Sequence, residues 1–350
     1  MIRHRANKPF SPLKENTTSC IINPAIQRRI TVKIAFRHLF LNEEKQAHLD
    51  ALARSAALTP LWYADDETPQ ACDLQDCEAL IGNFSPELLR QLPSLKWMQT
   101  AYAGVDKLCA AKWANEDAVL TNCSGAFGIA IAEYMLTGLM MLFRLMPDYA
   151  ANQQQKLWQR VGQCRSIYGS TITVVGMGDI GSRFAHIAKT MGATVRGVRR
   201  THGDIPTDFD QVYTSDQLAE AVTDVDAVIM ALPGTPATHH IVNKAILACM
   251  DKRTVIVNCG RGATLDEAAL TAALREKRIA GAVLDVMEAE PLPAESPLWH
   301  MENVIITPHI SGRNEDTVNG ESIYRIIAEN LERYVKGQPL THVVDRRIGY

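Results

Sequence analysis

The feature that most constrains this chain is a glycine-rich turn between an apolar run and an amphipathic segment. The run STITVVG leads into GMGDIG, and apolar residues then recur at helical spacing through residue 192. Gly176, Gly178 and Gly181 have the spacing of a loop that holds a dinucleotide pyrophosphate at a helix N-terminus. The spacing alone is a weak signal. Its place between a strand and a helix favours a nucleotide-binding domain over a glycine-rich turn without a ligand.

Short apolar runs alternate with helical patterns from residue 31 onward. Helices are predicted over residues 43–56, 126–146, 179–192 and 314–337. Strands are predicted over residues 31–36, 96–100, 119–122, 170–176, 193–198, 226–232, 254–259, 281–286 and 303–308. This alternation predicts an α/β fold with parallel sheets, doubly wound in the nucleotide-binding part.

The order of these segments predicts a discontinuous domain layout. The dinucleotide-binding domain is expected over residues 124–312, and residues 31–123 plus 313–350 are expected to form the substrate domain. Residues 1–30 are basic, poor in acids and interrupted by Pro9, Pro12 and Pro24. These prolines would break an amphipathic helix, so a poorly ordered extension, or translation from an upstream start codon, is favoured over an organelle transit peptide.

Composition narrows the classes of protein. With 350 residues the chain has room for two domains, and its net charge of −3 gives no reason to expect a nucleic-acid partner. Eight cysteines without paired metal-ligand spacing predict free thiols in the cytoplasm and no metal site. Glu133 and Arg144 interrupt the most apolar stretch, so a buried helix is favoured there and no membrane association is expected.

The stretch VRGVRRTHG departs from the usual dinucleotide-binding pattern. An Asp or Glu at the end of the second strand would bind the adenosine ribose 2′-hydroxyl of NAD, but Arg199 and Arg200 stand there, followed by Thr201. Arginine binds a phosphate through paired, charge-assisted hydrogen bonds. The stretch therefore favours NADP over NAD, with a solvated surface pair as the alternative.

Three further side chains follow predicted strand ends and form a chemical set. They are Arg261 in NCGRG, Glu290 in LDVMEAEPLP and His309 in TPHISG. An arginine can hold a substrate carboxylate, and a histidine can transfer a proton near neutral pH. A glutamate can orient the imidazole and stabilise its protonated form. Each residue has an ordinary surface or loop interpretation, but together they indicate a catalytic site.

The motifs GMGDIG, NCGRG, LDVMEAEPLP, SPLW and TPHISG, in this order, resemble the D-isomer-specific 2-hydroxyacid dehydrogenase family. The resemblance covers roughly residues 95–350 and is weaker back to residue 31. It implies two Rossmann- or flavodoxin-like domains with the active site in the cleft between them, and a homodimer. Arg261 would bind and polarise a 2-oxo acid, His309 would be the acid–base residue and Glu290 its partner. In the stretch AYAGVD, Ala103 and Gly104 would bind the substrate carboxylate through backbone N–H groups, and Tyr102 would shape the pocket.

The resemblance also implies a set of cofactor contacts. Asp285 would lie near the nicotinamide carboxamide, and Leu232 and Pro233 would lie on the adenosine side. The full set of expected dinucleotide contacts is Gly176, Met177, Gly178, Asp179, Ile180, Gly181, Arg199, Arg200, Thr201, Leu232, Pro233, Cys259, Asp285, His309 and Gly312.

The expected activity is transfer of hydride between NAD(P)H, preferably NADPH, and a small 2-oxo acid such as glyoxylate, hydroxypyruvate or pyruvate. Two alternatives remain at this point. One is a corepressor-like protein that senses NAD(P)H without catalysis. The other is a dehydrogenase of a phosphorylated acid such as 3-phosphoglycerate, which needs additional cationic groups in the cleft.

Overall fold

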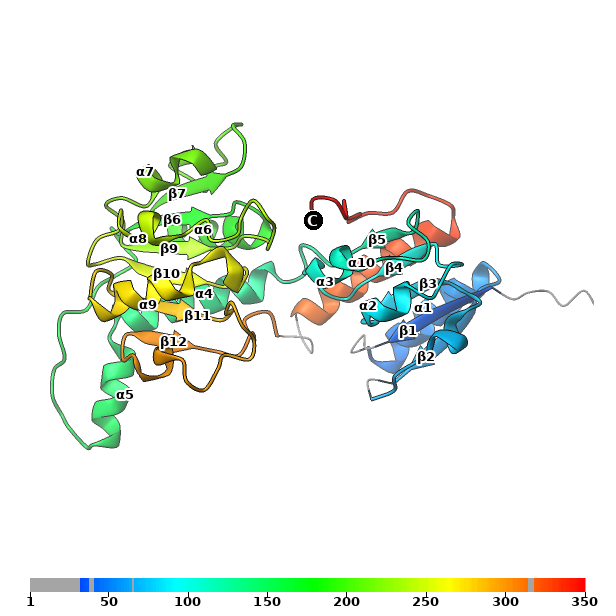
Figure 1. The fold of residues 1–350 in the computed structure, drawn as a ribbon, viewed down its shortest axis with the longest axis horizontal. Coiled ribbons are helices and arrows are strands. Elements are labelled where there is room, and N and C mark those ends of the chain that lie inside the picture. Colours follow the sequence, from blue (N-terminus) through cyan, green and yellow to red (C-terminus); the bar gives the residue numbers. More distant parts are fainter. Residues whose placement is uncertain (1–31, 38–40, 65, 314–317, 350) are drawn as a thin grey trace, which may run out of the picture.

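The computed structural model describes residues 32–37, 41–64, 66–313 and 318–349, so the predicted extension over residues 1–30 lies outside the described residues. The chain forms two α/β units, each built on one parallel sheet (Figure 1). The first unit contains the sheet β1–β5, and the second unit contains the sheet β6–β12. Residues 124–127 and 311–313 lie on the connections between the two units.

The first sheet has the strand order β2-β1-β3-β4-β5, and every neighbouring pair is parallel. This is the flavodoxin-like order, which has a change of direction between its first and third strands. The strands are β1 (Lys33–Arg37), β2 (Thr59–Tyr63), β3 (Cys77–Gly82), β4 (Trp97–Gln99) and β5 (Val119–Thr121).

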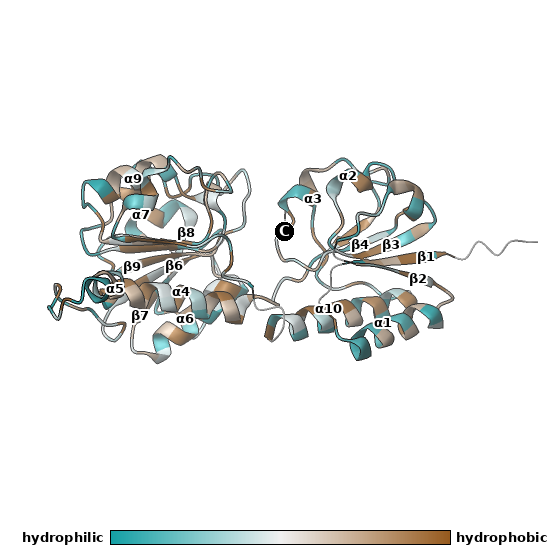
Figure 2. Ribbon diagram, turned by 90° about the horizontal axis from the view of Figure 1, so that it is seen from below, coloured by the Kyte–Doolittle hydropathy of each residue, from teal (hydrophilic) through white to brown (hydrophobic). Residues whose placement is uncertain are grey.

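Helices cover both faces of the first sheet (Figure 2). Helices α1 (Glu43–Ser55) and α10 (Val318–Val335) pack their apolar sides on one face, and α2 (Pro86–Leu89) and α3 (Asp106–Ala110) lie on the other. The C-terminal helix thus belongs to the first unit although its sequence follows the second.

A buried polar network fixes the C-terminal part of the chain to the first sheet. The Asn330 side-chain amide donates to Gln99 Oε1 (2.8 Å), which also accepts from the Thr121 hydroxyl (2.7 Å). Asn330 Oδ1 accepts from the backbone N–H of Thr341 (2.8 Å). Because these groups are buried, their hydrogen bonds specify one position for α10 and for the tail that follows it.

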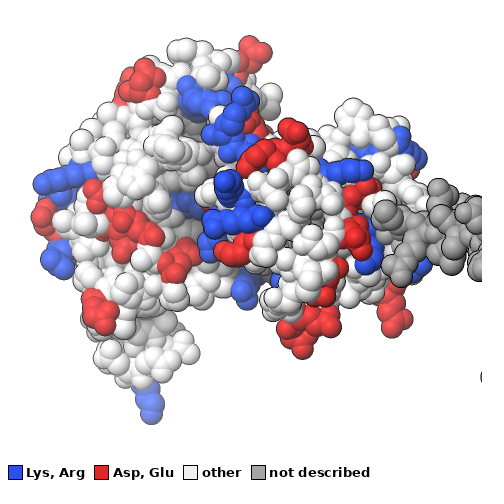
Figure 3. Space-filling model, turned by 45° about the vertical axis from the view of Figure 1, so that its right-hand side comes forward, with Lys and Arg blue, Asp and Glu red and all other residues white. Residues whose placement is uncertain are grey.

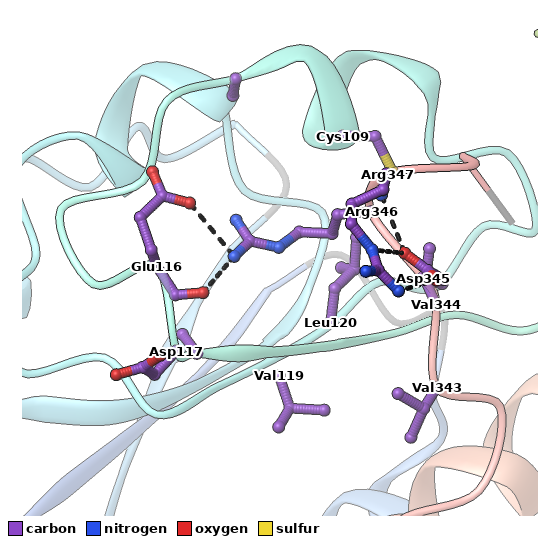
Figure 4. A pocket seen from close by; sticks show the side chains of 12 residues that line it. Cys109, Glu116, Asp117, Val119, Leu120, Val343, Val344, Asp345, Arg346 and Arg347 are labelled. Atoms are coloured by element: carbon purple, nitrogen blue, oxygen red, sulfur yellow. Dashed lines mark hydrogen bonds and ion pairs between the residues drawn. The ribbon is translucent and has the colours of Figure 1, made fainter.

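The tail continues beside the edge strand of the first sheet. Val343 forms an antiparallel bridge with Thr121, and the Val344 N–H donates to Leu120. Between this tail, β5 and α3 lies an open hollow of about 460 Å³ (Figure 4). Arg346 pairs with Glu116 there, and Arg347 pairs with Asp345.

The second sheet has the order β12-β11-β10-β9-β6-β7-β8, again entirely parallel. This is the Rossmann order extended by one strand, with its switch point between β6 and β9. The strands are β6 (Thr171–Val175), β7 (Thr194–Arg199), β8 (Gln211–Thr214), β9 (Ala227–Met230), β10 (Val255–Asn258), β11 (Gly281–Leu284) and β12 (Val304–Ile306).

Two apolar layers enclose this sheet. Helices α4 (Gly128–Phe143) and α6 (Asp179–Thr190) pack on one face. Helices α7 (Leu218–Ala221), α8 (Lys244–Leu247) and α9 (Glu267–Arg275) pack on the other. The central strands β9, β10 and β11 read as near-continuous apolar runs because both of their faces are buried.

Helix α4 is the apolar helix predicted over residues 126–146, and most of one side of it packs in the core of the second unit. It is followed by α5 (Met146–Gln154), which is bent by 65° from it and projects from the second unit (Figure 1). Within the described residues no single helix is long and apolar enough to cross a bilayer. The bent pair of α4 and α5 has a sufficient length and apolar composition only when the two helices are counted together.

The predicted α/β fold with two doubly wound parallel sheets is confirmed. Each predicted strand has a counterpart, but β2, β3 and β8 lie where no strand was predicted. Strands β2 and β8 are edge strands, β2 contains Pro60, and β8 is only partly buried, so neither carries a clear apolar signal. The sequence of β3, CEALIG, contains helix-forming residues, and burial between layers makes it a strand.

Candidate active site

The glycine-rich loop leaves the carboxyl end of β6 and enters α6, as its sequence predicts. Gly176 has a φ of +103°, which favours glycine, and a Cβ there would lie 2.7 Å from the Ala231 carbonyl oxygen. A Cβ on Gly181 would lie 1.9 Å from the Gly176 carbonyl oxygen. Both glycines are therefore required by the packing of the loop on the protein itself.

Gly178 differs, because a Cβ built on it would meet no atom of the protein within 4 Å. It is the N-cap residue of α6, where the first backbone N–H groups of the helix have no intrahelical acceptor. Open space in front of free N–H groups at a positive helix end is what a pyrophosphate needs. The loop therefore fits a dinucleotide.

The other residues of the loop turn their side chains away from this space. Met177 and Ile180 pack on the core of the second unit. The Asp179 carboxylate accepts from Arg183 Nε (2.7 Å) and lies against Gly128 at the start of α4. These contacts leave their backbone groups as the parts that can face a ligand.

Arg199 is the last residue of β7 and its side chain is half-buried. Its Nη2 donates to the backbone carbonyl of Asp204 (2.9 Å), and its Nε is buried without a hydrogen-bond partner. Because the carbonyl is a neutral acceptor, this hydrogen bond does not neutralise the positive charge of the guanidinium, which can still attract an anion. Arg200 and Thr201 follow it in the loop and are exposed.

Two loops at the neighbouring strand ends lie against each other. A Cβ on Gly260 would lie 2.6 Å from the carbonyl oxygen of Leu232, so the segment with Leu232 and Pro233 contacts the segment after β10. Cys259 is buried here, and burial raises the pKa of its thiol well above the ordinary value. The thiol therefore stays protonated.

Asp285 holds the loop that carries His309. Its side chain is 1% exposed and accepts from the Thr307 hydroxyl (2.6 Å) and the backbone N–H groups of Ile310 (2.8 Å) and Ser311 (2.9 Å). The Tyr134 hydroxyl on α4 lies 2.5 Å from that of Thr307, and burial raises the Tyr134 pKa to about 12. A carboxylate with these donors positions the loop, although Asp285 was expected at the nicotinamide carboxamide.

His309 has a φ of +54°, and its backbone N–H donates to the carbonyls of Asp285 and Thr307. Its Nδ1 lies 2.9 Å from Glu290 Oε2, and Glu290 Oε1 accepts from the backbone N–H of Met287 (3.1 Å). Glu290 is thus oriented by the backbone and in turn orients the imidazole. A ring bound through Nδ1 has Nε2 available for a second partner.

Arg261 lies between the two units. It precedes the short 3₁₀ turn Gly262–Thr264 in the second unit, and its Nε donates to Asp106 Oδ2 of the first unit (2.9 Å). Its Nη1 donates to the Gly260 carbonyl (2.9 Å). A Cβ on Gly104 would lie 1.8 Å from its Nη2, so the guanidinium fills the space beside that glycine.

The loop AYAGVD follows β4 and meets Arg261 at Gly104 and at Asp106. The Ala103 carbonyl accepts from the Asn122 side chain (2.8 Å), which shapes the turn before Gly104. The Tyr102 side chain is exposed, and the Tyr102 carbonyl accepts from the Cys123 N–H (3.0 Å). The structure thus brings Gly104 and Arg261 together. Asp106 was not predicted as a site residue, although it stands inside the quoted motif.

Gly312 lies on the connection between the units. Its carbonyl accepts from the buried Asn319 side chain of α10 (2.6 Å), and a Cβ on it would lie 3.4 Å from Phe127. Lys and Arg side chains gather where the two units meet on the face drawn in Figure 3. Among the described residues, no group of three or more His, Cys, Asp or Glu side chains forms a potential metal site.

The chain resembles one family of known proteins in both sequence and structure. Residues 136–311 match the model of the D-isomer specific 2-hydroxyacid dehydrogenase family, NAD binding domain. A family protein from Aeromonas salmonicida has a similar structure, with a TM-score of 0.77 and 33% identity over 90% of this chain and 99% of that chain. An NADPH-dependent glyoxylate/hydroxypyruvate reductase from Sinorhizobium meliloti, solved with NADP and sulfate, has a TM-score of 0.77 and 26% identity, covering 91% of this chain and 99% of that one.

A D-3-phosphoglycerate dehydrogenase from Methanocaldococcus jannaschii is 30% identical over 78% of this chain. The match covers 52% of the length of that relative. The family model covers half of the chain, and the structural likeness extends over both units. The family and the class of enzyme predicted from the sequence are confirmed: the chain belongs to the D-isomer-specific 2-hydroxyacid dehydrogenases.

Proposed function

We propose that this protein reduces small 2-oxo acids of the glyoxylate and hydroxypyruvate class with NADPH as the preferred cofactor. The observation that carries the proposal is the His309–Glu290 pair, which leaves Nε2 of an oriented imidazole for a substrate. Arg261 and the backbone of Gly104, which lie against each other, would hold the substrate carboxylate. The Sinorhizobium meliloti relative is named for this activity.

The site residues have separate roles in this reaction. When bound, the reduced nicotinamide supplies hydride to the carbonyl carbon. Arg261 and the Gly104 N–H orient the oxo acid by its carboxylate, and Arg261 stabilises the charge that develops on the carbonyl oxygen. His309 in its protonated form donates the proton to that oxygen, and Glu290 stabilises the imidazolium before the transfer.

The same proposal assigns the domains. Residues 31–123 and 313–350 would form the substrate domain, and residues 124–312 the dinucleotide-binding domain. The support is that β1–β5 and α10 share one core, whereas β6–β12 share another. In this assignment Gly104 comes from the substrate domain, and Arg261, Glu290 and His309 come from the dinucleotide-binding domain.

NADPH preference rests on Arg199. It stands at the strand end where an acid would bind the ribose 2′-hydroxyl, and its guanidinium donates to the neutral carbonyl oxygen of Asp204. Arg200 and Thr201 would complete the contact to a 2′-phosphate. The remaining expected contacts, including Leu232, Pro233, Cys259 and Gly312, stay predictions.

The Methanocaldococcus jannaschii relative makes a 3-phosphoglycerate-type substrate the second candidate. A panel assay with purified protein separates the two. Glyoxylate, hydroxypyruvate, pyruvate and 3-phosphohydroxypyruvate would each be tested with NADPH and with NADH by the loss of reduced-nicotinamide absorbance. A higher kcat/KM for the phosphorylated acid would contradict the proposed substrate class.

A homodimer and a cytoplasmic location are also proposed. The projecting helix α5 has no buried residue, and the loop after it exposes Leu157 and Trp158, the latter at 104% of its reference area. Apolar side chains exposed in this way mark an interface, and a second copy of the chain is the proposed partner. The cysteines of the described residues are free thiols, as a reducing compartment requires, and cell fractionation tests the location.

Two glycine variants test the dinucleotide site. Gly178→Ala should fold with wild-type thermal stability, because its Cβ meets no protein atom, yet bind NADPH much more weakly because the Cβ occupies the phosphate space. Gly181→Ala should lose both stability and binding, since its Cβ overlaps the Gly176 carbonyl. Thermal melts and fluorescence titration measure the two effects, and wild-type affinity in the Gly178 variant would contradict the site.

His309→Ala tests the acid–base role. The kcat for glyoxylate reduction should fall about 10²- to 10⁴-fold, because proton transfer loses its positioned donor. The dissociation constant for NADPH should stay unchanged. His300→Ala, at an exposed histidine of the second unit, is the matched control and should keep wild-type kinetics. Near wild-type kcat in the His309 variant would remove this residue from the mechanism.

Arg199→Ala tests cofactor choice. The kcat/KM for NADPH should fall about 10- to 100-fold, as expected for loss of charge-assisted hydrogen bonds, and that for NADH should change little. Arg196→Ala is the control, since Arg196 lies on the same strand and donates to the Thr223 carbonyl. An equal loss with both cofactors would show that Arg199 does not read the 2′-phosphate.

Trp158→Asp tests the homodimer. If this side chain is buried against a second copy, the charge should weaken association, so light scattering coupled to gel filtration should show dimers for the wild type and monomers for the variant. Trp299→Asp, at another exposed tryptophan of the second unit, is the control. A monomeric wild type would contradict the dimer.

A further inference from the structure

The Arg261 guanidinium has a different neighbour at each of its three nitrogens. Nε donates to Asp106 Oδ2 (2.9 Å), and Nη1 donates to the Gly260 carbonyl (2.9 Å). Nη2 lies beside Gly104, where a Cβ would come within 1.8 Å of it. The planar group is therefore fixed on two sides and directs its third nitrogen toward the loop that is proposed to hold the substrate carboxylate.

Asp106 reaches Arg261 from the other unit. It directly follows the stretch AYAGV and is the first residue of α3, so it lies two residues after Gly104 in the chain. Its Oδ2 accepts from Arg261, and its Oδ1 lies toward the loop after β9, 3.1 Å from a Cβ built on Gly234. The carboxylate thus contacts two loops of the second unit, and this contact requires the relative arrangement of the units seen here.

The position of Asp106 on the guanidinium allows two roles for this carboxylate. A carboxylate can pair with an arginine along the edge of Nη1 and Nη2 or along the edge of Nε and Nη2. Asp106 bonds to Nε, at one end of the second edge, while Nη2 lies beside Gly104. Asp106 can therefore hold the guanidinium in place or compete with the substrate for it, and the direction of the change in KM distinguishes these two roles. An arginine side chain free to rotate would lose about 2 kcal/mol of rotamer entropy on binding substrate, and a fixed one would lose less.

A third possibility is an ordinary surface ion pair. The two side chains are 31% and 41% exposed, and exposed pairs contribute about 0–1 kcal/mol to stability. On stability alone the pair would matter little. The ion pair matters because it sets the orientation of the Arg261 guanidinium. Its effect should therefore appear in the KM and kcat for the oxo acid.

We propose that Asp106 is a positioning residue of the substrate site, holding Arg261 at Nε so that Nη2 and the Gly104 backbone together bind the carboxylate of the 2-oxo acid. This inference rests on the proposed function. It adds a residue that does not touch the substrate and that connects the arrangement of the two units to the orientation of Arg261.

The experiment compares Asp106→Ala and Asp106→Asn with the wild-type enzyme. Wild-type turnover of a 2-oxo acid is measured first, so that failure of the proposed function is recognised by itself. In the Ala variant the KM for glyoxylate should rise about tenfold or more and kcat should fall, as for loss of a charged hydrogen bond. The dissociation constant for NADPH and the thermal midpoint should stay at wild-type values. The Asn variant keeps an amide oxygen that accepts from Nε, so its KM for glyoxylate should lie between those of the wild type and the Ala variant.

Two further readouts separate positioning from a purely structural effect. Formate added to the Ala variant should fill the place of the missing carboxylate and raise kcat/KM, whereas in the wild type it should only inhibit. In an Arg261→Ala background, Asp106→Ala should add no further loss, because its effect acts through that arginine. Asp117→Ala, at an exposed aspartate of the same unit, is the matched control and should leave the kinetics unchanged.

Three results would overturn the proposal. A lower KM in the Ala variant would mean that Asp106 competes with the substrate for Arg261. Unchanged kinetic constants in both variants would leave only a surface ion pair. A full additional loss in the Arg261→Ala background would mean that Asp106 acts by another route. If the Ala variant has a lowered thermal midpoint, its kinetic constants do not count, and the KM of the Asn variant for glyoxylate is compared with the wild-type value instead.

Discussion

The parallel pairing of every strand is the constraint on which this structure depends. Parallel strands need crossover connections, so all the carboxyl ends of one sheet meet at a single edge. This edge therefore collects the segments that follow the strands of the second sheet. They are the glycine loop after β6, Arg199 at the end of β7, and the loops after β9, β10, β11 and β12. Residues separated by more than a hundred positions become neighbours because the strands have one direction.

At that edge, a buried carboxylate organises the loop that carries His309. Asp285 accepts hydrogen bonds from Thr307, Ile310 and Ser311, and its carbonyl accepts from His309. An unpaired carboxylate in this place would be costly, and its donors are supplied by the loop it must hold. The positive φ of His309 is sustained by these contacts, which turn the ring toward Glu290.

Much of the site was predictable, because chemistry and position coincide in short motifs. The glycines, Arg199 and the Arg–Glu–His set each follow an apolar run, and their types specify what they can bind. The same reasoning did not find Asp106, since an aspartate at the start of a short helix has an ordinary N-terminal interpretation. The expected contact of Asp285 with the nicotinamide carboxamide stays a prediction, and what the structure adds is that this carboxylate also holds the loop with His309.

By itself the sequence determined the α/β alternation, the dinucleotide loop and the family, because hydrophobic period and glycine spacing are local properties. Only the tertiary structure decided that CEALIG is a strand, that Asn330 fixes α10 to the first sheet through Gln99, and that Asp106 meets Arg261. These depend on contacts between segments distant in the chain, and no local pattern encodes which distant surface will cover a residue or which charge will lie opposite another.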